Sequence, residues 1–508
     1  MLRGKLKPLI KYSLFGGIVG GSLLSLHGNQ YQLDSIGIVR LGRAAFTVLQ
    51  IGVIYKKDLY GKGLEKSSSE YMQLKSICHK RSAEKLLDLC CTNKGTYIKV
   101  GQHIAALEYL LPKEYVETMK ILHCHAPTNK IEDVYKVIKE DLKKDPLEIF
   151  LTIEPEPLGT ASLAQVHKAT LKDGSIVAVK VQHPLRTRKL QSRYENHGMF
   201  SKTDELEFKF QWLVDQSKKN IPQELNFVQE GHNAEKIAKL FEDVDWLKVP
   251  SVRWDLTTSR VLTMDFVEGG QVNDLKYIQK NNINTYEISD KLGQLYSKMI
   301  FIYGFVHSDP HPGNILVKKN DKGYCDVILL DHGLYATLTD EFRANYANLW
   351  LSILNRDRKA MRSYSSQLGI EGDAYGLFAC MVTGRTWDSI LQGIDKKEMS
   401  KTEKKFMKQN FTGILPKISE VLQNVDPQML LVLKTNDLMR GIEHTLRTGT
   451  RMGAFCVMSE CCVKSVYKQR YKKCNKKIEK VKVSFGEFLG IVENKSVLYI
   501  FESKTIFS

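Results

Sequence analysis

Apolar residues recur at three- and four-residue steps from Asp34 to about Lys144. That spacing places apolar side chains on one face of a helix. We therefore predict helices over 68–93 (SSEYMQLKSICHKRSAEKLLDLCCTN), 112–127 (PKEYVETMKILHCHAP) and 131–144, with Pro146 stopping the last of them. The intervening stretch KGTYIKVGQHIAAL (94–107) predicts an ordinary helix that tolerates one glycine.

The pattern changes to strands after Pro157. LGTASLAQVHKATLKDGSIVAVKVQH (158–183) predicts a strand, a tight loop, a second strand, an Asp-Gly turn and a third strand. RVLTMDFVEGGQV and VILLDHGLY predict further strands within 260–272 and 327–335. The rest of the C-terminal half predicts helices at 286–304, 340–355 and 429–446; the charges of the last one favour a core helix over a membrane span.

Composition indicates a globular chain with a negatively charged partner. The 508 residues are 43% hydrophobic and 26% charged, and their net charge is +17. The stretch VKSVYKQRYKKCNKKIEKVKV (463–483) is strongly basic, and no RNA-recognition or zinc-finger pattern accompanies it. We therefore expect anionic membrane lipid rather than nucleic acid as the partner, with a solvated helix face as the alternative. The ten cysteines form no C-x-x-C pair, which indicates reduced thiols packed in helices.

The N-terminus resembles a targeting segment. Residues 1–33 contain four basic residues and no acid, which is typical of a mitochondrial presequence. The uncharged run YSLFGGIVGGSLLSL (12–26) is too short to span a bilayer unless it continues to Leu33. Its two G-x-x-x-G frames suit close helix contact in lipid. We expect mitochondrial import with an inner-membrane anchor in residues 1–33; a secretory signal peptide is the alternative.

The densest candidate chemistry is the loop FVHSDPHPGNIL, residues 305–316. It could be a solvated turn, or a metal site built from its histidines and aspartate. A third interpretation fits the spacing better: in kinases a loop Asp positions the nucleophile, and an Asn five residues later binds magnesium. Asp309 and Asn314 have that separation. Asp331 follows a buried strand further on, where a second magnesium ligand is expected.

Four further parts occur in the order that a kinase requires. Each has an ordinary alternative when taken alone, such as a surface lysine or a solvated acidic face. The phosphate loop, VAVK, the acidic helix, HSDPHPGN and LLDHG nevertheless give five matches in order, which make chance a poor explanation. The parts before the loop are the small-residue phosphate loop Gly159, Thr160, Ala161 and Ser162, the strand lysine Lys180, the acidic helix with Glu224 and Glu230, and the strand and hinge with Met264 and Phe266 that would contact adenine.

With these parts the chain resembles the UbiB-type, aarF-domain-containing atypical kinases over roughly residues 30–470. The most specific signatures are KVGQ (99–102) and HSDPHPGN (307–314). The resemblance implies an α+β, two-lobed kinase-like fold with ATP and Mg²⁺ between the lobes. It assigns the phosphates to Lys180, held by Glu230, and the acceptor hydroxyl or water to Asp309. Asn314 and Asp331 would bind Mg²⁺.

The resemblance also implies a regulatory helix. Lys99 and Gln102 would occlude the place of a protein substrate, and Glu224 would face Lys99. If Glu224 and Glu230 share a helix, their carboxylates lie about 120° apart. Three stretches depart from the family pattern: the E-x-D motif ends in Asn226, the phosphate loop is GTAS rather than alanine-rich, and residues 185–210 are polar where an apolar helix is usual.

These interpretations give an expected organisation of an anchor (1–33), a helical K-x-G-Q extension (34–150), an N-lobe (151–270), a C-lobe (271–400) and a helical C-terminal extension (401–508). The expected function is a mitochondrial, ATP-dependent atypical kinase or ATPase that supports inner-membrane lipid or quinone homeostasis and membrane architecture. Inner-membrane proteins are possible further partners. A serine/threonine protein kinase and a membrane scaffold independent of kinase activity are the alternatives.

Overall fold

The computed structural model describes residues 37–65, 68–93, 96–105, 112–124, 128–160, 163–183, 222–309, 311–393, 417–418, 421–422, 424–448 and 452–473. The predicted anchor, Ala161, Ser162 and the segment 185–210 lie outside these residues. The described chain divides into two compact units. The first holds residues up to 146, 154–167 and 180–183, and the second holds the others.

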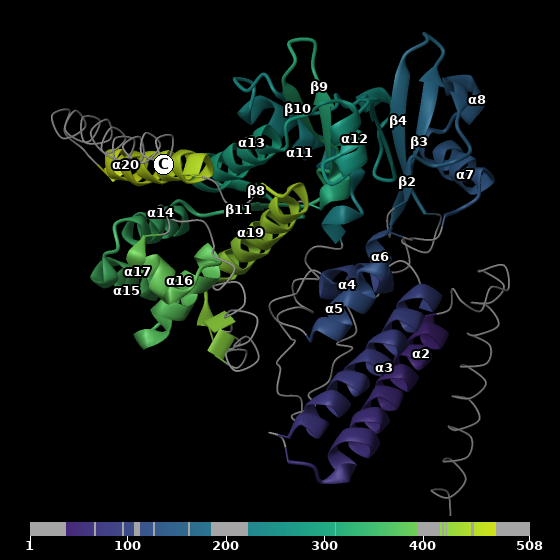
Figure 1. Ribbon diagram of the computed structural model, residues 1–508. Coiled ribbons are helices and arrows are strands. Elements are labelled where there is room, and N and C mark those ends of the chain that lie inside the picture. The colour runs from purple at the N-terminus through teal and green to yellow at the C-terminus, as the bar shows by residue number, and fades with distance from the viewer. Residues whose placement is uncertain are drawn as a thin grey trace, which may run out of the picture. The chain divides into compact units, whose positions relative to one another are not determined.

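The first unit is mainly helical (Figure 1). Its long helices α2 and α3 lie side by side, and the Asn93 side chain donates to the Arg40 carbonyl at 3.2 Å. The predicted helix at 68–93 is confirmed, and the one at 112–127 is split at Lys120. The elements are α2 (Gly37–Val53), η2 (Ile54–Leu59), η3 (Tyr60–Lys62), α3 (Ser69–Asn93), α4 (Thr96–Ala105), α5 (Lys113–Met119), α6 (Ile121–Cys124) and α7 (Ile131–Leu142).

Two details before the sheet differ from the prediction. The helix α7 ends at Leu142 because Lys143 adopts a left-handed backbone with φ of 57°, and Pro146 instead opens the short helix α8 (Pro146–Ile149). The strand β1 (Phe150–Ile153) precedes Pro157, where no strand was predicted. Its two outer residues are buried and its two central ones exposed, so it lacks the alternation that marks longer strands.

The main sheet has the strand order β1-β3-β4-β6, with β2 paired to β3. The predicted strands and the Asp-Gly turn between 158 and 183 are confirmed. Gly174 has a φ of +86°, which glycine adopts without strain, and the Asp173 side chain accepts from the Ser175 N–H at 2.8 Å. The other strands are β2 (Gly159–Thr160), β3 (Ala164–Leu171), β4 (Ile176–Gln182) and β6 (Val261–Asp265).

Smaller sheets in the second unit carry the loop motifs. One has the order β5-β10-β9-β7, and the other pairs β8 with β11. The ladder between β9 and β10 matches Ile315 with Leu329, so the loops that precede β9 and follow β10 leave the sheet at one end. The strands are β5 (Leu247–Lys248), β7 (Gly270–Gln271), β8 (Phe305–His307), β9 (Ile315–Lys319), β10 (Cys325–Leu329) and β11 (Tyr335–Thr337).

Helices make up the remainder of the second unit. The predicted helices at 286–304, 340–355 and 429–446 are confirmed, the first continuing as a π-helix. The described helices of this unit are α11 (Phe227–Leu240), η4 (Trp254–Leu256), α12 (Leu275–Lys280), α13 (Thr285–Ser297), η5 (Lys298–Tyr303), η6 (Pro312–Asn314), α14 (Asp340–Leu354), α15 (Arg358–Gln367), η7 (Gly372–Ala374), α16 (Tyr375–Thr383), α17 (Trp387–Gln392), α19 (Pro427–Leu446) and α20 (Met452–Lys473).

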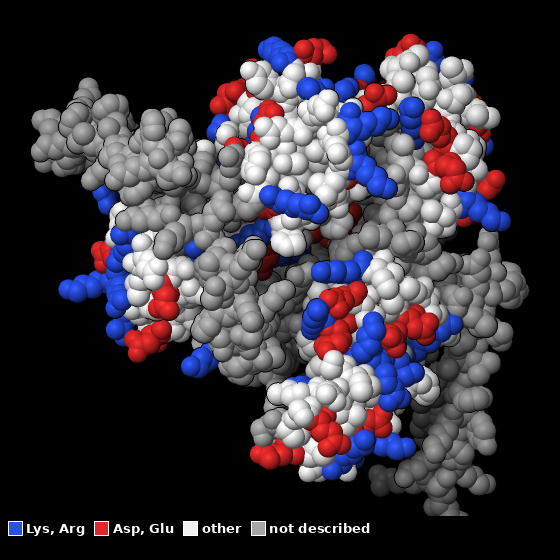
Figure 2. Space-filling view, viewed as in Figure 1, with Lys and Arg blue, Asp and Glu red and all other residues white. Residues whose placement is uncertain are grey.

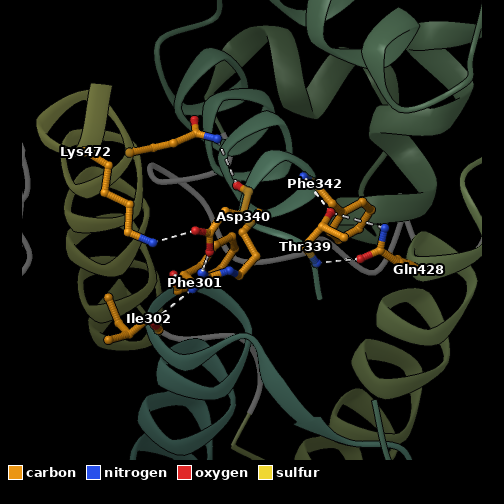
Figure 3. A network of polar contacts seen from close by, with 9 residues as sticks. Phe301, Ile302, Thr339, Asp340, Phe342, Gln428 and Lys472 are labelled. Atoms are coloured by element: carbon orange, nitrogen blue, oxygen red, sulfur yellow. Dashed lines mark hydrogen bonds and ion pairs between the residues drawn. The ribbon is translucent and has the colours of Figure 1, made fainter. Parts of the chain in front are cut away.

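Two C-terminal helices are tied to the start of α14 (Figure 3). Gln428 of α19 accepts from the Thr339 N–H at 2.7 Å. Lys472 of α20 lies 2.5 Å from the Asp340 carboxylate, which also pairs with Arg343. The hydrogen bond from Lys472, and after it the one from Arg343, lowers the pKa of Asp340. Within the described residues, no helix is long and apolar enough to cross a membrane.

Charged residues of both signs share the surface (Figure 2), and the expected packing of cysteines in helices has one exception, Cys325, which begins the strand β10. Figure 2 shows Lys and Arg interspersed with Asp and Glu over the face that it presents, rather than one field of a single sign. The seven cysteines whose side chains are described are free thiols, and five of these seven are buried.

Candidate functional site

His307 joins the two loops that the sequence singled out. It ends β8 and is only 2% exposed. Its Nδ1 accepts from the Asp309 N–H at 3.1 Å, so Nε2 carries the ring proton and donates to the Asp331 carbonyl at 2.8 Å. Burial lowers the pKa of His307, which keeps the ring neutral, and the two backbone contacts select this tautomer. One side chain therefore holds the backbones of Asp309 and Asp331 in a single frame.

A second set of contacts places Asn314 beside that frame. The Asn314 amide donates to the Asp309 carbonyl at 3.4 Å, and its backbone carbonyl accepts from the Leu330 N–H at 3.0 Å. The Asp331 carboxylate accepts from the Gly333 N–H at 2.8 Å. The amide of Asn314 and the carboxylate of Asp331 thus come from adjacent backbone segments, as the prediction of a shared magnesium site requires.

The donor set fits a magnesium ion held together with phosphates. Magnesium prefers oxygen ligands and usually takes one or two from the protein, and the others from phosphate and water. Asn314 and Asp331 supply an amide oxygen and a carboxylate. A histidine metal site fits less well, because both ring nitrogens of His307 bond the backbone and Nδ1 of His311 accepts from the Gly313 N–H at 3.1 Å. No cluster of three or more His, Cys, Asp or Glu in the described residues could hold a metal by itself.

The helix α11 docks on the loop after β10 through the backbone of His332. Glu230 is 2% exposed, and its Oε1 accepts from the His332 N–H at 3.3 Å. The Asn233 side chain donates to the His332 carbonyl at 2.9 Å. A Cβ built at Gly333 would lie 3.2 Å from Asp331 Oδ1 and 3.7 Å from Glu230 Oε2, so the glycine lets the two carboxylates share this corner. Sequence reasoning found Glu230 but not Asn233.

The carboxylate of Asp309 has a cationic neighbour from α19. Lys434 Nζ lies 3.5 Å from Asp309 Oδ1 and donates to the Ser308 carbonyl at 3.2 Å. The side chains of Lys434 and Asp309 are 18% and 28% exposed. Sequence reasoning missed Lys434, because the pattern around it indicates only a core helix and nothing in it marks a contact with a distant loop.

Two tyrosines, the buried Tyr296 and the half-buried Tyr335, lie near the same loops. Burial raises the pKa of Tyr296, and the nearby Asp309 carboxylate raises it further. Burial likewise raises the pKa of Tyr335, whose hydroxyl lies 2.9 Å from His332 Nδ1. Both phenols therefore stay neutral at any physiological pH, so these tyrosines add bulk and hydrogen-bonding capacity without charge.

The expected adenine-contacting residues lie at the end of β6. Met264 is 8% exposed, and the Phe266 N–H donates to the Ile176 carbonyl at 3.2 Å. Lys168 Nζ lies 5.1 Å from the centroid of the Phe266 ring. The hinge is thus ordered by a backbone bond to β4, and its role toward a nucleotide stays a prediction.

The expected phosphate-binding residues lie in β2 and β4. Lys180 stands between Val179 and Val181, which are 0% and 1% exposed, so its strand is fixed by the core. Gly159 and Thr160 form β2 and pair with β3. Ala161 and Ser162 lie outside the described residues.

The K-x-G-Q signature lies on α4 and is packed within the first unit. A Cβ built at Gly101 would lie 2.2 Å from Leu122 Cδ1 and 3.3 Å from Cys90 Sγ, so any larger residue would displace the buried Leu122 side chain. The Gln102 amide donates to the Leu122 carbonyl at 2.9 Å. Gln102 and Gly101 thereby hold α4 on α6. Lys99 lies on the same helix, and its side chain is outside the described atoms.

Glu224 and Glu230 do not share a helix, so the expected offset of about 120° between their carboxylates does not apply. The helix α11 begins at Phe227, and Asn226 precedes it with an extended backbone at φ of −115° and ψ of 93°. Asparagine favours such non-helical positions at a helix start over the helix interior. Glu224 therefore lies in a separate turn before α11.

A lysine-bearing strand, a buried glutamate on α11, and an Asp, Asn and Asp whose backbone segments are linked by hydrogen bonds define a kinase-like α+β protein. The comparisons agree. The model of the ABC1 atypical kinase-like domain matches residues 121–365. A protein called AarF domain-containing kinase 1, from Drosophila melanogaster, is 56% identical over 473 residues, covering 92% of this chain and 91% of its own. The chain belongs to the ABC1, or AarF-domain, atypical kinase family, as its motifs predicted.

Two more distant proteins extend the comparison. The probable serine/threonine-protein kinase abkB of Dictyostelium discoideum is 35% identical over 439 residues, covering 85% of this chain and 63% of that protein. A solved structure of Rv3197 with erythromycin, from Mycobacterium tuberculosis, is 19% identical, covers 75% of this chain and 96% of that one, and has a TM-score of 0.51. The second likeness supports the α+β fold that the sequence predicted.

Proposed function

We propose that the chain is an ATP-dependent atypical kinase or ATPase that binds ATP together with Mg²⁺. The observation that carries this proposal is the His307 bridge, because it holds the backbones of Asp309 and Asp331 in one frame. A phosphoryl-transfer site needs little covalent chemistry from the protein. It needs phosphates, metal and acceptor held in fixed positions.

In this proposal each residue has a separate task. Lys180 orients the phosphates, Glu230 supports that lysine, and Asp309 orients a hydroxyl or water. Asn314 and Asp331 hold Mg²⁺, which supplies charge neutralisation at the phosphates when it is bound. An ATPase needs no further nucleophile, since water can serve as the acceptor.

Nucleotide binding is tested by thermal unfolding with and without MgATP. Saturating MgATP at about 100 times its Kd should add about 2.7 kcal/mol of stability. Lys180→Ala should weaken binding about ten- to 150-fold, because a charge-assisted contact contributes roughly 1.5–3 kcal/mol. Asp331→Asn should remove the magnesium dependence. Lys318→Ala, an exposed lysine on β9, is the matched control. Equal shifts in all variants would place the nucleotide elsewhere.

We further propose an anionic bilayer as a partner, through the exposed face of α2. Phe46, Leu49 and Val53 are 62%, 67% and 60% exposed, whereas the same helix buries Arg40 and Thr47 to 7% and 9% exposure. An apolar outer face suits a helix lying in the membrane interface. The exposed lysines after α2, Lys56, Lys57 and Lys62, complement anionic headgroups.

Vesicle flotation tests this surface. The protein without the expected anchor at residues 1–33 should float with vesicles that contain anionic phospholipid, and less with neutral ones. The double variant Phe46→Ser, Leu49→Ser should lose most of that binding, whereas Tyr324→Ser, at a residue that is 61% exposed in the second unit, should not. Equal flotation of both variants would contradict this assignment.

The proposal includes a location in mitochondria, at the inner membrane, with a role in lipid or quinone homeostasis and membrane architecture. Its support is the acid-free, basic start of the sequence. Removal of residues 1–33 should leave the protein outside mitochondria, and carbonate should not extract the full-length form. Secretion or a cytosolic location of the intact chain would overturn this part alone.

A serine/threonine protein kinase is the second candidate, favoured by the name of the Dictyostelium relative. Mass spectrometry after incubation with MgATP separates the two candidates. Phosphorylation of unrelated peptides by the wild type would favour the protein kinase, and phosphate release without it would favour the ATPase. If a variant that cannot bind the nucleotide restored the function lost when the gene is deleted, the scaffold alternative would be favoured.

A further inference from the structure

The helix α19 (Pro427–Leu446) passes beside the loop that carries Asp309 and contacts it through Lys434. The family model matches residues 121–365, so this helix lies beyond the matched domain. Four contacts along α19 fix it to other helices and loops. Gln428 bonds Thr339, Asn436 donates to the Tyr346 hydroxyl at 3.2 Å, Arg440 donates to the Val382 carbonyl at 2.5 Å, and Glu443 accepts from Ser289 at 3.4 Å.

This anchoring sets the position of Lys434, which lies between these contacts. The side chain reaches the loop at two atoms: the Ser308 carbonyl at 3.2 Å and Asp309 Oδ1 at 3.5 Å. Because Ser308 and Asp309 are neighbours, one ammonium group restrains both the backbone before the aspartate and the carboxylate itself. The helix start that carries Gln428 is visible beside Thr339 in Figure 3.

We propose that Lys434 is a positioning residue for phosphoryl transfer, which holds the Asp309 carboxylate in the orientation that receives the acceptor. This inference rests on the proposed function of the same site. His307 fixes Asp309 through its backbone N–H, and Lys434 fixes it through its carboxylate, so the two contacts are complementary. Its cation also lies beside the place where the acceptor is oriented, which favours negative charge that develops there.

The test compares Lys434→Met with Lys434→Arg and with Lys291→Met. Lys291 is a matched control in the second unit: its side chain is 12% exposed, and Nζ bonds one carboxylate, Glu287, and one carbonyl, Cys325, each at 2.6 Å. Both methionine variants remove a half-buried cation with the same kinds of partner. Only one of them removes it from the Asp309 loop.

Two readouts are measured on the full-length protein. Peptide-level hydrogen exchange over residues 305–316 reports the order of the loop without any turnover. Phosphate release with MgATP reports the chemistry. Lys434→Met should increase exchange in this peptide and lower kcat about 100-fold, the effect expected for misplacing a reacting group by about 1 Å. The KM for MgATP should change less than about threefold in Lys434→Met. The kcat of Lys434→Arg should be at least about tenfold higher than that of Lys434→Met, because arginine keeps the positive charge.

The outcomes separate the two proposals. Unchanged exchange and turnover in Lys434→Met, or equal losses in Lys434→Met and Lys291→Met, would overturn the positioning role while MgATP turnover by the wild type stands. Increased exchange in Lys434→Met with no turnover in the wild type would support the contact and reject the proposed phosphoryl transfer.

Discussion

Glu443 should make the attachment of α19 depend on pH. Burial raises the pKa of this carboxyl from 4.5 to about 7, opposed by the Arg440 guanidinium and reinforced by the Asp290 carboxylate. A carboxyl whose pKa is higher in the folded state stabilises the fold fully below pH 4.5, and this contribution is lost as the pH rises to about 7. At about 1.4 kcal/mol per pH unit the loss is on the order of 3 kcal/mol.

The variant Glu443→Gln isolates this contribution because glutamine cannot ionise. At pH 5 the variant and the wild type should unfold at similar urea concentrations. At pH 8 the variant should be more stable by up to about 3 kcal/mol, since the wild type then carries a half-buried charge. The exposed Glu341→Gln is the control and should behave as the wild type at both pH values.

Tryptophan fluorescence suits this assay. Of the five tryptophans, Trp246, Trp254, Trp350 and Trp387 lie in the second unit with α19, so the signal reports mainly the unit of interest. A stability difference between Glu443→Gln and the wild type that is the same at pH 5 and pH 8 would refute the reasoning. A variant that is less stable than the wild type at pH 8 would refute it as well.

Two further perturbations follow from the packing and the loop geometry. Gly101→Ala should destabilise the first unit by about 1–3 kcal/mol in urea unfolding, because the new Cβ would lie 2.2 Å from Leu122 Cδ1. The control Gly42→Ala, on α2, adds a Cβ with nothing within 4 Å and should stabilise the unit by about 0.5–1 kcal/mol. Equal effects of the two substitutions would contradict the close packing at Gly101. His307→Phe should cost about 1–3 kcal/mol for each backbone group left unpaired. Burial lowers the pKa of His307 below 6.5, so the wild type should lose stability as the pH falls through 6.5, and the variant should lack that slope.

Much of the fold could be predicted from local patterns. The helices α3 and α14, the strand carrying Lys180, and the Asp-Gly turn each follow from the spacing of apolar residues or from turn chemistry within a few positions. The ordered motifs also predicted that Asp309, Asn314 and Asp331 serve one site, and the His307 bridge and the turn at Asn314 bring their backbones together.

The features that sequence reasoning missed depend on long-range packing. Nothing near Lys434 shows that α19 passes the Asp309 loop, because that contact is set by anchors at both ends of the helix. The strand β1 is too short to show alternation. The spacing of Glu224 and Glu230 does not reveal the break before α11, which follows from the preference of Asn226 for the start of a helix.

Phosphate release from ATP by the purified full-length protein tests the central claim most directly. The measurement is made with Mg²⁺ or EDTA, with and without anionic vesicles, for the wild type, Asp309→Asn and Asp331→Asn. We predict magnesium-dependent release by the wild type and a loss of at least about 100-fold in each variant, the scale expected when a positioned charge is removed from a transfer site. Release by both variants at the rate of the wild type, or no release by the wild type in any of these conditions, would contradict the account.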